Sequence, residues 1–285
     1  MTIQEAYKHL LYKLFEVYDD REAANICDWV IEHITGFKKI DRITRKNFLL
    51  NEQQRKILND YTNELLQHKP VQYVLHEAWF AGMKLYVDES VLIPRPETEE
   101  LADWIITNCK LQIANSILDI GTGSGCIPIA LKKKMPSSEI QALDVCEKAL
   151  IVAKRNAAVH HTEIHFHQSD ILNKEEWKQF SSYDIIVSNP PYIKQSEVTE
   201  MRENVLLHEP HIALFVPDED ALLFYRTIAA FGSQHLNTNG ELYFEINEMQ
   251  SENIINLLHE YGYKSIELKK DMQGKERMVK ATYNL

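Results

Sequence analysis

Apolar and polar positions alternate along the N-terminal part of the chain with the period of an α-helix. Apolar residues recur at three- and four-residue spacing through residues 6–17 and 23–34, and a third run, residues 57–65, follows Asn51, a residue that can cap a helix. No glycine-rich loop and no pairing of catalytic residue types accompanies these runs. The pattern predicts a small helical domain over residues 1–74, which we expect to serve substrate recognition.

The spacing of apolar positions changes beyond these helices. Two short extended pieces, residues 78–80 and 84–87, lie on either side of Gly82, and this arrangement predicts a β-hairpin. We expect residues 75–92 to form a hairpin linker between two domains, with residues 93–285 as the second domain.

From Ser116 onward, short apolar strands alternate with amphipathic helices. The predicted strands are residues 116–120, 139–143, 164–167, 183–188, 241–246, 265–268 and 277–282, and the predicted helices are residues 126–134, 147–159, 220–235 and 250–261. Repeated β-α-β order predicts an open parallel sheet with helices on both faces. A short Gln273-Gly274 turn between the last two strands adds an antiparallel edge. The predicted fold is therefore α/β, with a Rossmann-like, mostly parallel, seven-stranded sheet preceded by a small helical domain.

The overall composition disfavours several classes of protein. The chain has a formal net charge of −11, which argues against stable binding of long nucleic acid through its phosphates. No apolar stretch approaches the length needed to cross a bilayer, and the first residues lack the pattern of a signal peptide. The four cysteines, Cys27, Cys109, Cys126 and Cys146, show no C-x-x-C spacing. We expect a monomeric cytoplasmic protein with reduced thiols and no membrane attachment.

A glycine-rich loop, residues 119–125 (Asp-Ile-Gly-Thr-Gly-Ser-Gly), follows the first predicted strand of the sheet and opens a helix. Glycines there let the backbone approach a ligand and turn sharply into the helix N-terminus. Cys126 occupies the position at which a dinucleotide-binding fingerprint requires its third glycine. The Asp119 carboxylate would repel a pyrophosphate but suits the ammonium group of a methionine moiety. The loop therefore favours S-adenosyl-L-methionine over NAD as the cofactor.

Two further acidic residues follow the next two predicted strands. Asp144 is placed to accept from both ribose hydroxyls of the cofactor, and Asp170 from its adenine amino group, with Ile171 against the ring. Each acid alone could be a loop cap, but α/β sheets bind ligands at the carboxyl ends of their strands. Glu245, within a later strand, is either a buried acid near the cofactor or a side chain pointing out of a sheet edge. The expected cofactor-binding residues are Asp119, Gly121, Thr122, Gly123, Ser124, Gly125, Asp144, Asp170, Ile171 and Asn189.

The apolar run of residues 183–188 stops abruptly at Asn189-Pro190-Pro191-Tyr192. Neither proline can donate a backbone hydrogen bond, so the carbonyls of this loop are left free to accept from something else. An amide side chain, exposed carbonyls and an aromatic ring at the end of a strand can bind a planar NH2 group. The alternative is a simple strand-ending turn, because Asn-Pro is a common turn starter.

The glycine-rich loop and the Asn-Pro-Pro-Tyr motif in one sheet resemble the class I methyltransferases that alkylate planar exocyclic or amide nitrogens. Other stretches narrow the resemblance to the HemK/PrmC family, the methyltransferases of peptide chain release factors. These stretches are Lys69-Pro70-Val71-Gln72-Tyr73, Ile93-Pro94-Arg95-Pro96-Glu97-Thr98-Glu99, Glu209-Pro210 and Asp271-Met272-Gln273-Gly274-Lys275-Glu276-Arg277. Two positions depart from the family pattern: His76, where glycine is usual, and Val216-Pro217, which replaces a glycine-rich stretch.

The resemblance implies the class I methyltransferase fold and transfer of a methyl group from S-adenosyl-L-methionine, with S-adenosyl-L-homocysteine as product. The implied acceptor is the side-chain amide nitrogen of the glutamine in the Gly-Gly-Gln motif of class I release factors. The Asn189 side-chain oxygen and the Pro190 carbonyl would each accept one amide hydrogen, and Tyr192 would pack against the amide plane. The implied catalytic residues are Asn189, Pro190, Pro191 and Tyr192, and the implied substrate-pocket residues are Arg95 and Glu97.

Other functions fit parts of the sequence. The Asn-Pro-Pro-Tyr motif would also serve a methyltransferase of adenine or guanine amino groups, although the acidic chain and the lack of an added basic RNA-binding module argue against it. A glutamine of a ribosomal protein is another possible acceptor. A non-catalytic adaptor would be expected to have lost part of the cofactor loop or Asn189, and both are present. The clustered histidines His160, His161, His165 and His167 lack a metal-ligand pattern, so we expect no metal site.

Overall fold

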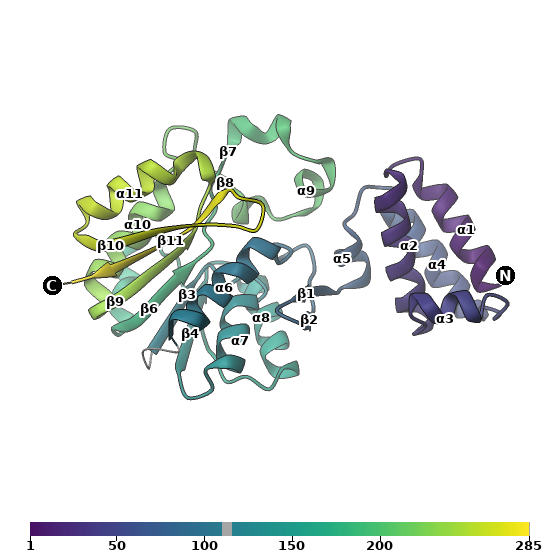
Figure 1. The fold of residues 1–285 in the computed structure, drawn as a ribbon, viewed down its shortest axis with the longest axis horizontal. Helices are drawn as coiled ribbons and strands as arrows, with labels where there is room; N and C mark the ends of the chain where they lie inside the picture. Colours follow the sequence, from purple (N-terminus) through teal and green to yellow (C-terminus); the bar gives the residue numbers. More distant parts are fainter. Residues whose placement is uncertain (110–115, 285) are drawn as a thin grey trace. The chain divides into compact units, whose positions relative to one another are not determined.

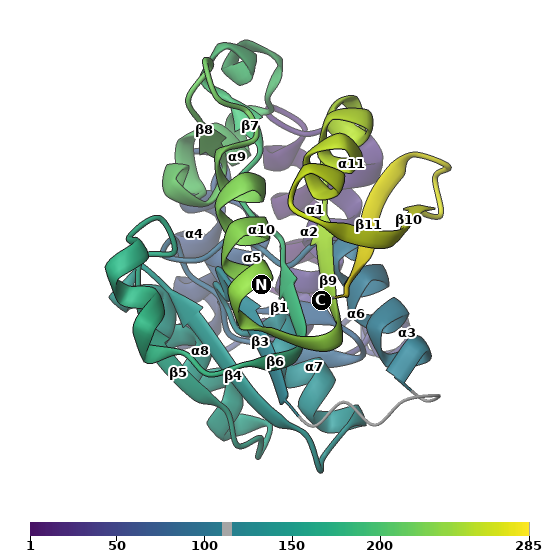
Figure 2. The ribbon, with the colours of Figure 1, turned by 90° about the vertical axis from the view of Figure 1, so that its left-hand side faces the viewer.

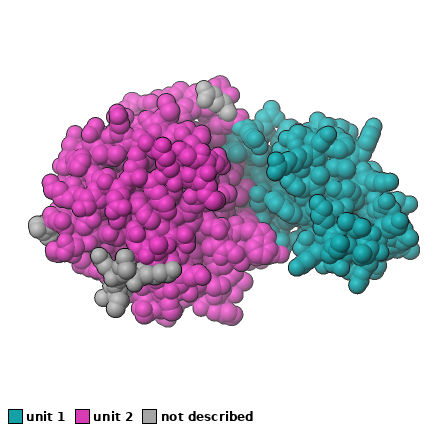
Figure 3. Space-filling view, in the orientation of Figure 1, with its two compact units in different colours: residues 1–77, 202–208 teal, residues 78–201, 209–285 magenta. Residues whose placement is uncertain are grey.

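The computed structural model describes residues 1–109 and 116–284. The chain divides into two compact units, each with its own hydrophobic core (Figure 3). Unit 1 comprises Met1–Glu77 and Arg202–His208, and unit 2 comprises Ala78–Met201 and Glu209–Leu285. The residues that the sequence singles out for chemistry lie in unit 2.

Unit 1 is helical. Its helices are α1 (Ile3–Leu14), α2 (Asp20–Thr35), α3 (Lys39–Thr44), α4 (Glu52–Leu65), α5 (Val71–Leu75) and α9 (Glu203–His208). The apolar faces of α1, α2 and α4 meet in one core, as the helical spacing predicts. Asn51 caps α4, and its side chain accepts a hydrogen bond from the backbone N–H of Gln54 at 2.8 Å. The predicted helices of this region are therefore confirmed.

Helix α9 belongs to unit 1 although it lies far from the other helices in the sequence. The His208 Nε2 atom is 2.9 Å from the Gln67 carbonyl oxygen, and the His68 Nε2 atom is 3.2 Å from the Glu203 carboxylate. The sequence pattern does not predict this association.

Unit 2 is organised around a seven-stranded sheet with the strand order β10-β11-β9-β6-β3-β4-β5 (Figure 2). The strands are β3 (Ser116–Ile120), β4 (Glu139–Asp144), β5 (His165–Gln168), β6 (Tyr183–Ser188), β9 (Leu236–Glu245), β10 (Tyr263–Lys270) and β11 (Glu276–Tyr283). Strand β11 is antiparallel to both of its neighbours, and the other strand pairs are parallel. The predicted fold is confirmed, and its order places β3 beside β6.

Helices cover both faces of this sheet (Figure 1). They are α6 (Pro96–Cys109), α7 (Cys126–Lys134), α8 (Glu147–Val159), α10 (Leu223–His235) and α11 (Ser251–Glu260). Neighbouring residues of one strand enter different cores, because side chains alternate between the faces of a sheet. Ile185 packs in the core that includes residues of α6 and α7, whereas Ile186 packs in the core that includes residues of α10 and α11.

Two small sheets complete unit 2. Strands β1 (Ala78–Phe80) and β2 (Met83–Leu85) form the predicted antiparallel hairpin, whereas β7 (Ile193–Lys194) and β8 (Phe215–Val216) form a parallel pair that the sequence does not predict. Short 3-10 helices span Lys174–Gln179, Gln195–Glu200, His211–Ala213 and Glu248–Gln250. Among the described residues, no helix is both long enough and apolar enough to span a membrane.

Candidate active site

A cavity of about 250 Å³ lies in unit 2, and its wall includes residues that follow the carboxyl ends of β3, β4, β5 and β6. The predicted site residues in this wall are Arg95, Gly121, Thr122, Gly123, Ser124, Asp144, Asp170, Ile171, Asn189, Pro190 and Pro191. Asp119, Gly125, Glu97 and Tyr192 are not part of the wall. The sheet therefore brings the glycine-rich loop, the acidic residues and the Asn-Pro-Pro motif to one cavity.

The glycine-rich loop needs conformations that side chains disfavour. Gly121, Gly123 and Gly125 all have left-handed backbone angles, with φ values of 75°, 53° and 80°. At Gly125 an added Cβ would also lie 3.2 Å from the Ala153 Cβ on α8. The loop is fastened to the end of β4, since the Gly121 N–H donates to the Leu143 carbonyl at 2.9 Å.

Asp119 is a buried acid without a partner. Its side chain is fully buried, and neither carboxylate oxygen has a hydrogen-bond partner among the described residues. The hydroxyls of Thr122 and Ser124 are likewise buried and unpartnered. Burial raises the pKa of Asp119 to about 7. Orphaned acceptors of this kind fit a ligand that brings a cationic or hydrogen-bond-donating group, as the amino acid moiety of S-adenosyl-L-methionine does.

Asp144 holds the loop and faces the cavity at the same time. Its Oδ2 atom accepts from the Gly123 N–H and its Oδ1 atom from the Cys146 N–H, both at 2.9 Å. Burial raises the pKa of Asp144, and the backbone donors act against this rise. Each carboxylate oxygen can accept a second hydrogen bond, so the residue retains acceptor capacity for a ribose hydroxyl.

Asp170 and Ile171 form the next part of the wall. Asp170 Oδ1 accepts from the Leu172 N–H at 2.9 Å, so this acid caps a turn while it lines the cavity. Ile171 is buried, and its carbonyl accepts from the Trp177 indole at 2.8 Å. An apolar side chain beside a carboxylate fits the ring and amino group of an adenine.

Asn189 and Pro190 present free acceptors. The Asn189 Nδ2 atom donates to the Thr98 hydroxyl at 3.0 Å, and among the described residues its Oδ1 atom and the Pro190 carbonyl accept no hydrogen bond. Both residues line the cavity. Two neighbouring acceptors with no intramolecular donor can bind a group that has two N–H bonds.

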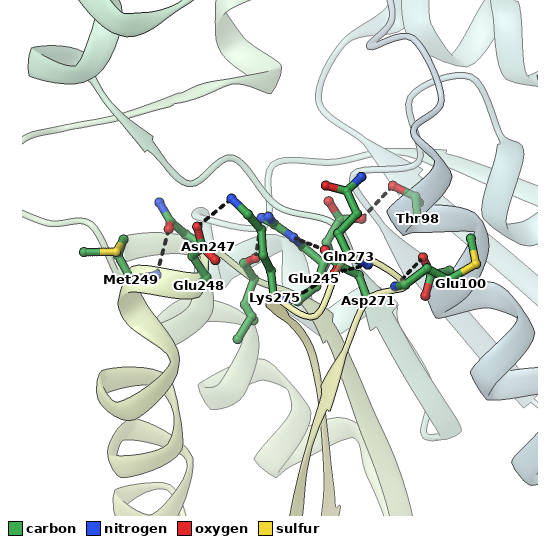
Figure 4. A network of polar contacts seen from close by, with 12 residues as sticks. Thr98, Glu100, Glu245, Asn247, Glu248, Met249, Asp271, Gln273 and Lys275 are labelled. Atoms are coloured by element: carbon green, nitrogen blue, oxygen red, sulfur yellow. Dashed lines mark hydrogen bonds and ion pairs between the residues drawn. The ribbon is translucent and has the colours of Figure 1, made fainter.

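Asn189 is joined to a buried chain of hydrogen bonds that sequence reasoning missed, and Figure 4 shows its contact between Thr98 and Glu245. The Thr98 hydroxyl donates to the Glu245 carboxylate at 2.6 Å, and the Tyr192 hydroxyl is 3.5 Å from the other oxygen of that carboxylate. Thr98 lies in the first turn of α6, which begins at Pro96, and its side chain is buried. Glu245 is buried rather than pointing out of an edge, because β9 is paired on both sides.

The turn between β10 and β11 lies beside Glu245 (Figure 4). Asp271 shapes this turn, and its Oδ1 atom accepts from the backbone N–H groups of Gln273 and Lys275 at 2.9 Å each. Arg277 donates to the Ile246 carbonyl at 3.3 Å and brings positive charge toward Glu245. This motif of the sequence therefore supports the site from behind rather than lining the cavity.

Arg95 and Glu97 differ in their surroundings. Arg95 lines the cavity and forms an ion pair of 2.6 Å with the buried Glu209 carboxylate, which also accepts from the Ile93 N–H at 3.3 Å. Glu97 is half-buried and lies near Tyr192 and Glu245 without forming part of the cavity wall. Among the described residues, no group of three His, Cys, Asp or Glu side chains is placed to hold a metal ion.

Comparisons with known proteins show which family this sequence resembles. Residues 101–216 match the family model of the methyltransferase small domain, and residues 5–75 match that of the PrmC N-terminal domain. The chain is 41% identical to a release factor glutamine methyltransferase of Flavobacterium psychrophilum, over 99% of this chain and 100% of that one. It is 38% identical to a protein of the same name from Bacteroides thetaiotaomicron, over 96% and 97% of the two chains.

A solved structure supports the fold independently. The 16S rRNA N2 G1207 methyltransferase of Thermus thermophilus, in complex with AdoMet and guanosine, superposes with a TM-score of 0.52 at 14% identity, over 73% of this chain and 50% of that one. This likeness concerns the class I methyltransferase fold. The relatives, which are matched over nearly their whole length, show that the chain belongs to the release factor glutamine methyltransferases.

Proposed function

We propose that this protein transfers the methyl group of S-adenosyl-L-methionine to the side-chain amide nitrogen of the glutamine in the Gly-Gly-Gln motif of class I peptide chain release factors. The observation that carries the proposal is a pair of acceptors, Asn189 Oδ1 and the Pro190 carbonyl, in the wall of the same cavity as the glycine-rich loop, neither of which accepts a hydrogen bond from any residue that the structure describes. Membership of the family supports the acceptor.

The residues of the loop and of the strand ends would hold the cofactor. Asp119 would face its ammonium group, Asp144 its ribose hydroxyls, and Asp170 with Ile171 its adenine. Gly121, Thr122, Gly123, Ser124 and Gly125 form the backbone loop against which it would lie. When bound, S-adenosyl-L-methionine supplies a methyl group made electrophilic by a sulfonium centre.

Asn189 and Pro190 would orient the substrate amide. An amide nitrogen is a poor nucleophile because its lone pair is delocalised into the carbonyl. Accepting one N–H each, the Asn189 and Pro190 oxygens would fix the plane of the amide and raise the electron density on its nitrogen. Orientation of this kind can supply roughly 7–11 kcal/mol of a barrier in favourable cases. The amide proton becomes acidic only after the new bond has formed, so no strong base is required beforehand.

The remaining motif residues would shape the substrate pocket. Pro191 keeps the loop rigid, Tyr192 would pack against the amide plane, and Arg95 and Glu97 would form part of the pocket wall. Two acceptors facing the cavity also favour a glutamine over a glutamate side chain, because an ionised carboxylate has no N–H or O–H to donate. We assign unit 1 the recognition of the rest of the release factor.

The other expectations fit this assignment. A net charge of −11 argues against RNA or DNA bases as the acceptor. All four cysteines are free thiols, which supports a reducing, cytoplasmic location, where release factors act. We propose a monomer without stable nucleic-acid binding.

Transfer of labelled methyl groups tests the proposal. A purified release factor should receive label from labelled S-adenosyl-L-methionine, and the same factor with Gln→Ala in its Gly-Gly-Gln motif should receive none. Label on a ribosomal protein or on RNA instead of the release factor would keep the reaction and refute the acceptor.

A further inference from the structure

The Asn189 side chain is useful to the substrate in only one of two orientations. Its Oδ1 atom accepts hydrogen bonds and its Nδ2 atom donates them, and a half-turn of the amide group exchanges the two with little change in shape. A substrate NH2 group can donate to Asn189 only while Oδ1 faces the cavity. Something must therefore select this orientation.

Thr98 provides the selection because a hydroxyl has a single hydrogen. That hydrogen is directed to the Glu245 carboxylate, 2.6 Å away. With its hydrogen committed, the Thr98 oxygen can only accept from Asn189, and it does so from Nδ2 at 3.0 Å. The opposite orientation would set Oδ1 against an oxygen that has no hydrogen left to offer.

Glu245 also reaches the other end of the Asn-Pro-Pro-Tyr motif. One carboxylate oxygen accepts from Thr98, and the other lies 3.5 Å from the Tyr192 hydroxyl. Thr98, which is part of the cavity wall, and Glu245 are only 3% and 2% exposed, so both side chains are largely shielded from water. Three separate elements, α6, β9 and the loop after β6, therefore meet in one chain of hydrogen bonds.

We propose that Thr98 and Glu245 are positioning residues, whose hydrogen-bonded chain holds the Asn189 amide with its oxygen toward the substrate. This inference rests on the proposed function, because it assigns Asn189 the role of an acceptor for the substrate amide. Glu245 acts through Thr98, and Thr98 acts through Asn189.

The direction of the hydrogen bonds that link Glu245, Thr98 and Asn189 depends on whether Glu245 is charged. Ionised, Glu245 accepts the Thr98 hydrogen. Protonated, it can donate to Thr98, whose own hydrogen is then free to bond Oδ1 of a rotated Asn189. The charged and titratable groups that face Glu245 are Arg277 on β11, Arg95 just before α6, Glu97 in the first turn of α6, Tyr192 after β6, Tyr225 on α10 and Cys126 on α7.

Because the ionised form of Glu245 is the one that orients Asn189, we expect activity to be lost at low pH. Burial raises the pKa of Glu245 to about 7, and Thr98 and Arg277 act against that rise. Turnover at saturating cofactor should therefore decline as the pH falls through this region, since a growing fraction of Asn189 turns its donor toward the substrate.

The test compares Thr98→Val with Thr98→Ser. Valine keeps the shape and removes the hydroxyl, whereas serine keeps the hydroxyl. Thr227→Val is the matched control, because the Thr227 hydroxyl donates only within its own helix, to the Leu223 carbonyl at 2.9 Å. For each protein we would measure kcat for a release factor between about pH 5.5 and 8.5, and the affinity for S-adenosyl-L-methionine by calorimetry.

We expect Thr98→Val to lower kcat by about five- to tenfold, the equivalent of one hydrogen bond, with cofactor affinity unchanged within about twofold. It should also remove the decline of kcat on the acid side. Thr98→Ser and Thr227→Val should keep both the wild-type kcat and its pH profile.

Two results would overturn the inference: a Thr98→Val enzyme with wild-type kcat and pH profile, or equal impairment by valine and serine. If Thr98→Val does not fold, Glu245→Gln tests the same chain of hydrogen bonds. The glutamine side chain does not titrate, so the decline of kcat at low pH should disappear. An unchanged decline would refute the proposed positioning role. A wild-type enzyme that transfers no methyl group to a release factor would instead refute the proposed function.

Discussion

Replacing Asp119 with asparagine should have opposite effects on the protein with and without S-adenosyl-L-methionine. The Asp119 carboxylate is fully buried and has no hydrogen-bond partner among the described residues. Ionising it in the folded chain is therefore unfavourable, and the pKa is raised from 3.8 to about 7. Asparagine removes the charge and keeps the shape.

The magnitude follows from this difference in pKa. The pKa of Asp119 is higher in the folded than in the unfolded chain, so the stabilisation present below pH 4 is lost as the pH rises to about 7. At about 1.4 kcal/mol for each pH unit, the full loss is somewhat more than about 4 kcal/mol. Burying the asparagine amide without hydrogen-bond partners costs about 1–3 kcal/mol, and this cost offsets part of the gain from removing the charge. Without cofactor, the Asp119→Asn protein should therefore exceed the wild type in stability by about 1–3 kcal/mol at pH 8.

With S-adenosyl-L-methionine bound, the wild type should be more stable than Asp119→Asn. Removing one member of a buried charge pair commonly costs 2–5 kcal/mol, so the affinity of Asp119→Asn for S-adenosyl-L-methionine should fall by at least about 30-fold. Chemical denaturation at pH 5.5 and pH 8, with and without cofactor, measures the stabilities, and calorimetry measures the affinity.

Asp144→Asn is the control for these measurements. Asp144 accepts from two backbone N–H groups, so its replacement should destabilise the protein even without cofactor. Wild-type affinity for the cofactor in Asp119→Asn, or an equal loss of stability at both pH values, would refute the reasoning.

Three further predictions concern neighbouring parts of the site. Asn189→Ala should abolish methyl transfer and leave cofactor affinity within about twofold; an equal loss of both, in labelled transfer and calorimetry, would mean that Asn189 has another role. Gly125→Ala should weaken cofactor binding and lower the free energy of unfolding by about 1 kcal/mol or more, because φ is 80° and the new Cβ would lie 3.2 Å from that of Ala153; unchanged calorimetry and denaturation would contradict this. Arg95→Ala should cost about 1–3 kcal/mol in denaturation, because it leaves the buried Glu209 carboxylate without its ion pair, and adding Glu209→Gln should recover part of the loss.

The elements around the glycine-rich loop could be predicted from the sequence because local patterns determine them. The bounds of β3 (Ser116–Ile120) and α7 (Cys126–Lys134) agree with the prediction. Strand β9 does not agree, because it begins at Leu236 rather than residue 241. The sequence Asn-Thr-Asn-Gly is typical of a turn, and Asn239 does have a φ of 64°, yet Gly240 pairs with Tyr283 of β11. Pairing with the distant strand β11 therefore extends β9 through a sequence that would otherwise favour a turn.

The chain of hydrogen bonds behind Asn189 lay beyond sequence reasoning for a similar reason. Thr98 and Glu245 are 147 positions apart, and each has a plausible local explanation. A threonine followed by acidic residues is typical of a helix start, and an acid within a strand is typical of an exposed face. Both side chains turn inward because α6 lies against the sheet, which is a fact of tertiary packing. The association of α9 with unit 1 is unpredictable in the same way, since it depends on contacts of His208 and Glu203 with a distant helix end.

Two buried acids lie near the carboxyl ends of strands in this sheet, and their contacts distinguish a residue that binds a ligand from one that positions another side chain. Asp119 at the end of β3 and Glu245 at the end of β9 are both buried, and burial raises the pKa of each to about 7. Glu245 has partners within the protein, so its burial serves to hold Thr98 and Tyr192 in place. Asp119 has none among the described residues, and a buried carboxylate persists only where something compensates its charge. We therefore propose that a ligand cation compensates the ionised form of Asp119, which would place Asp119 at the cofactor and Glu245 in the geometry of the substrate site.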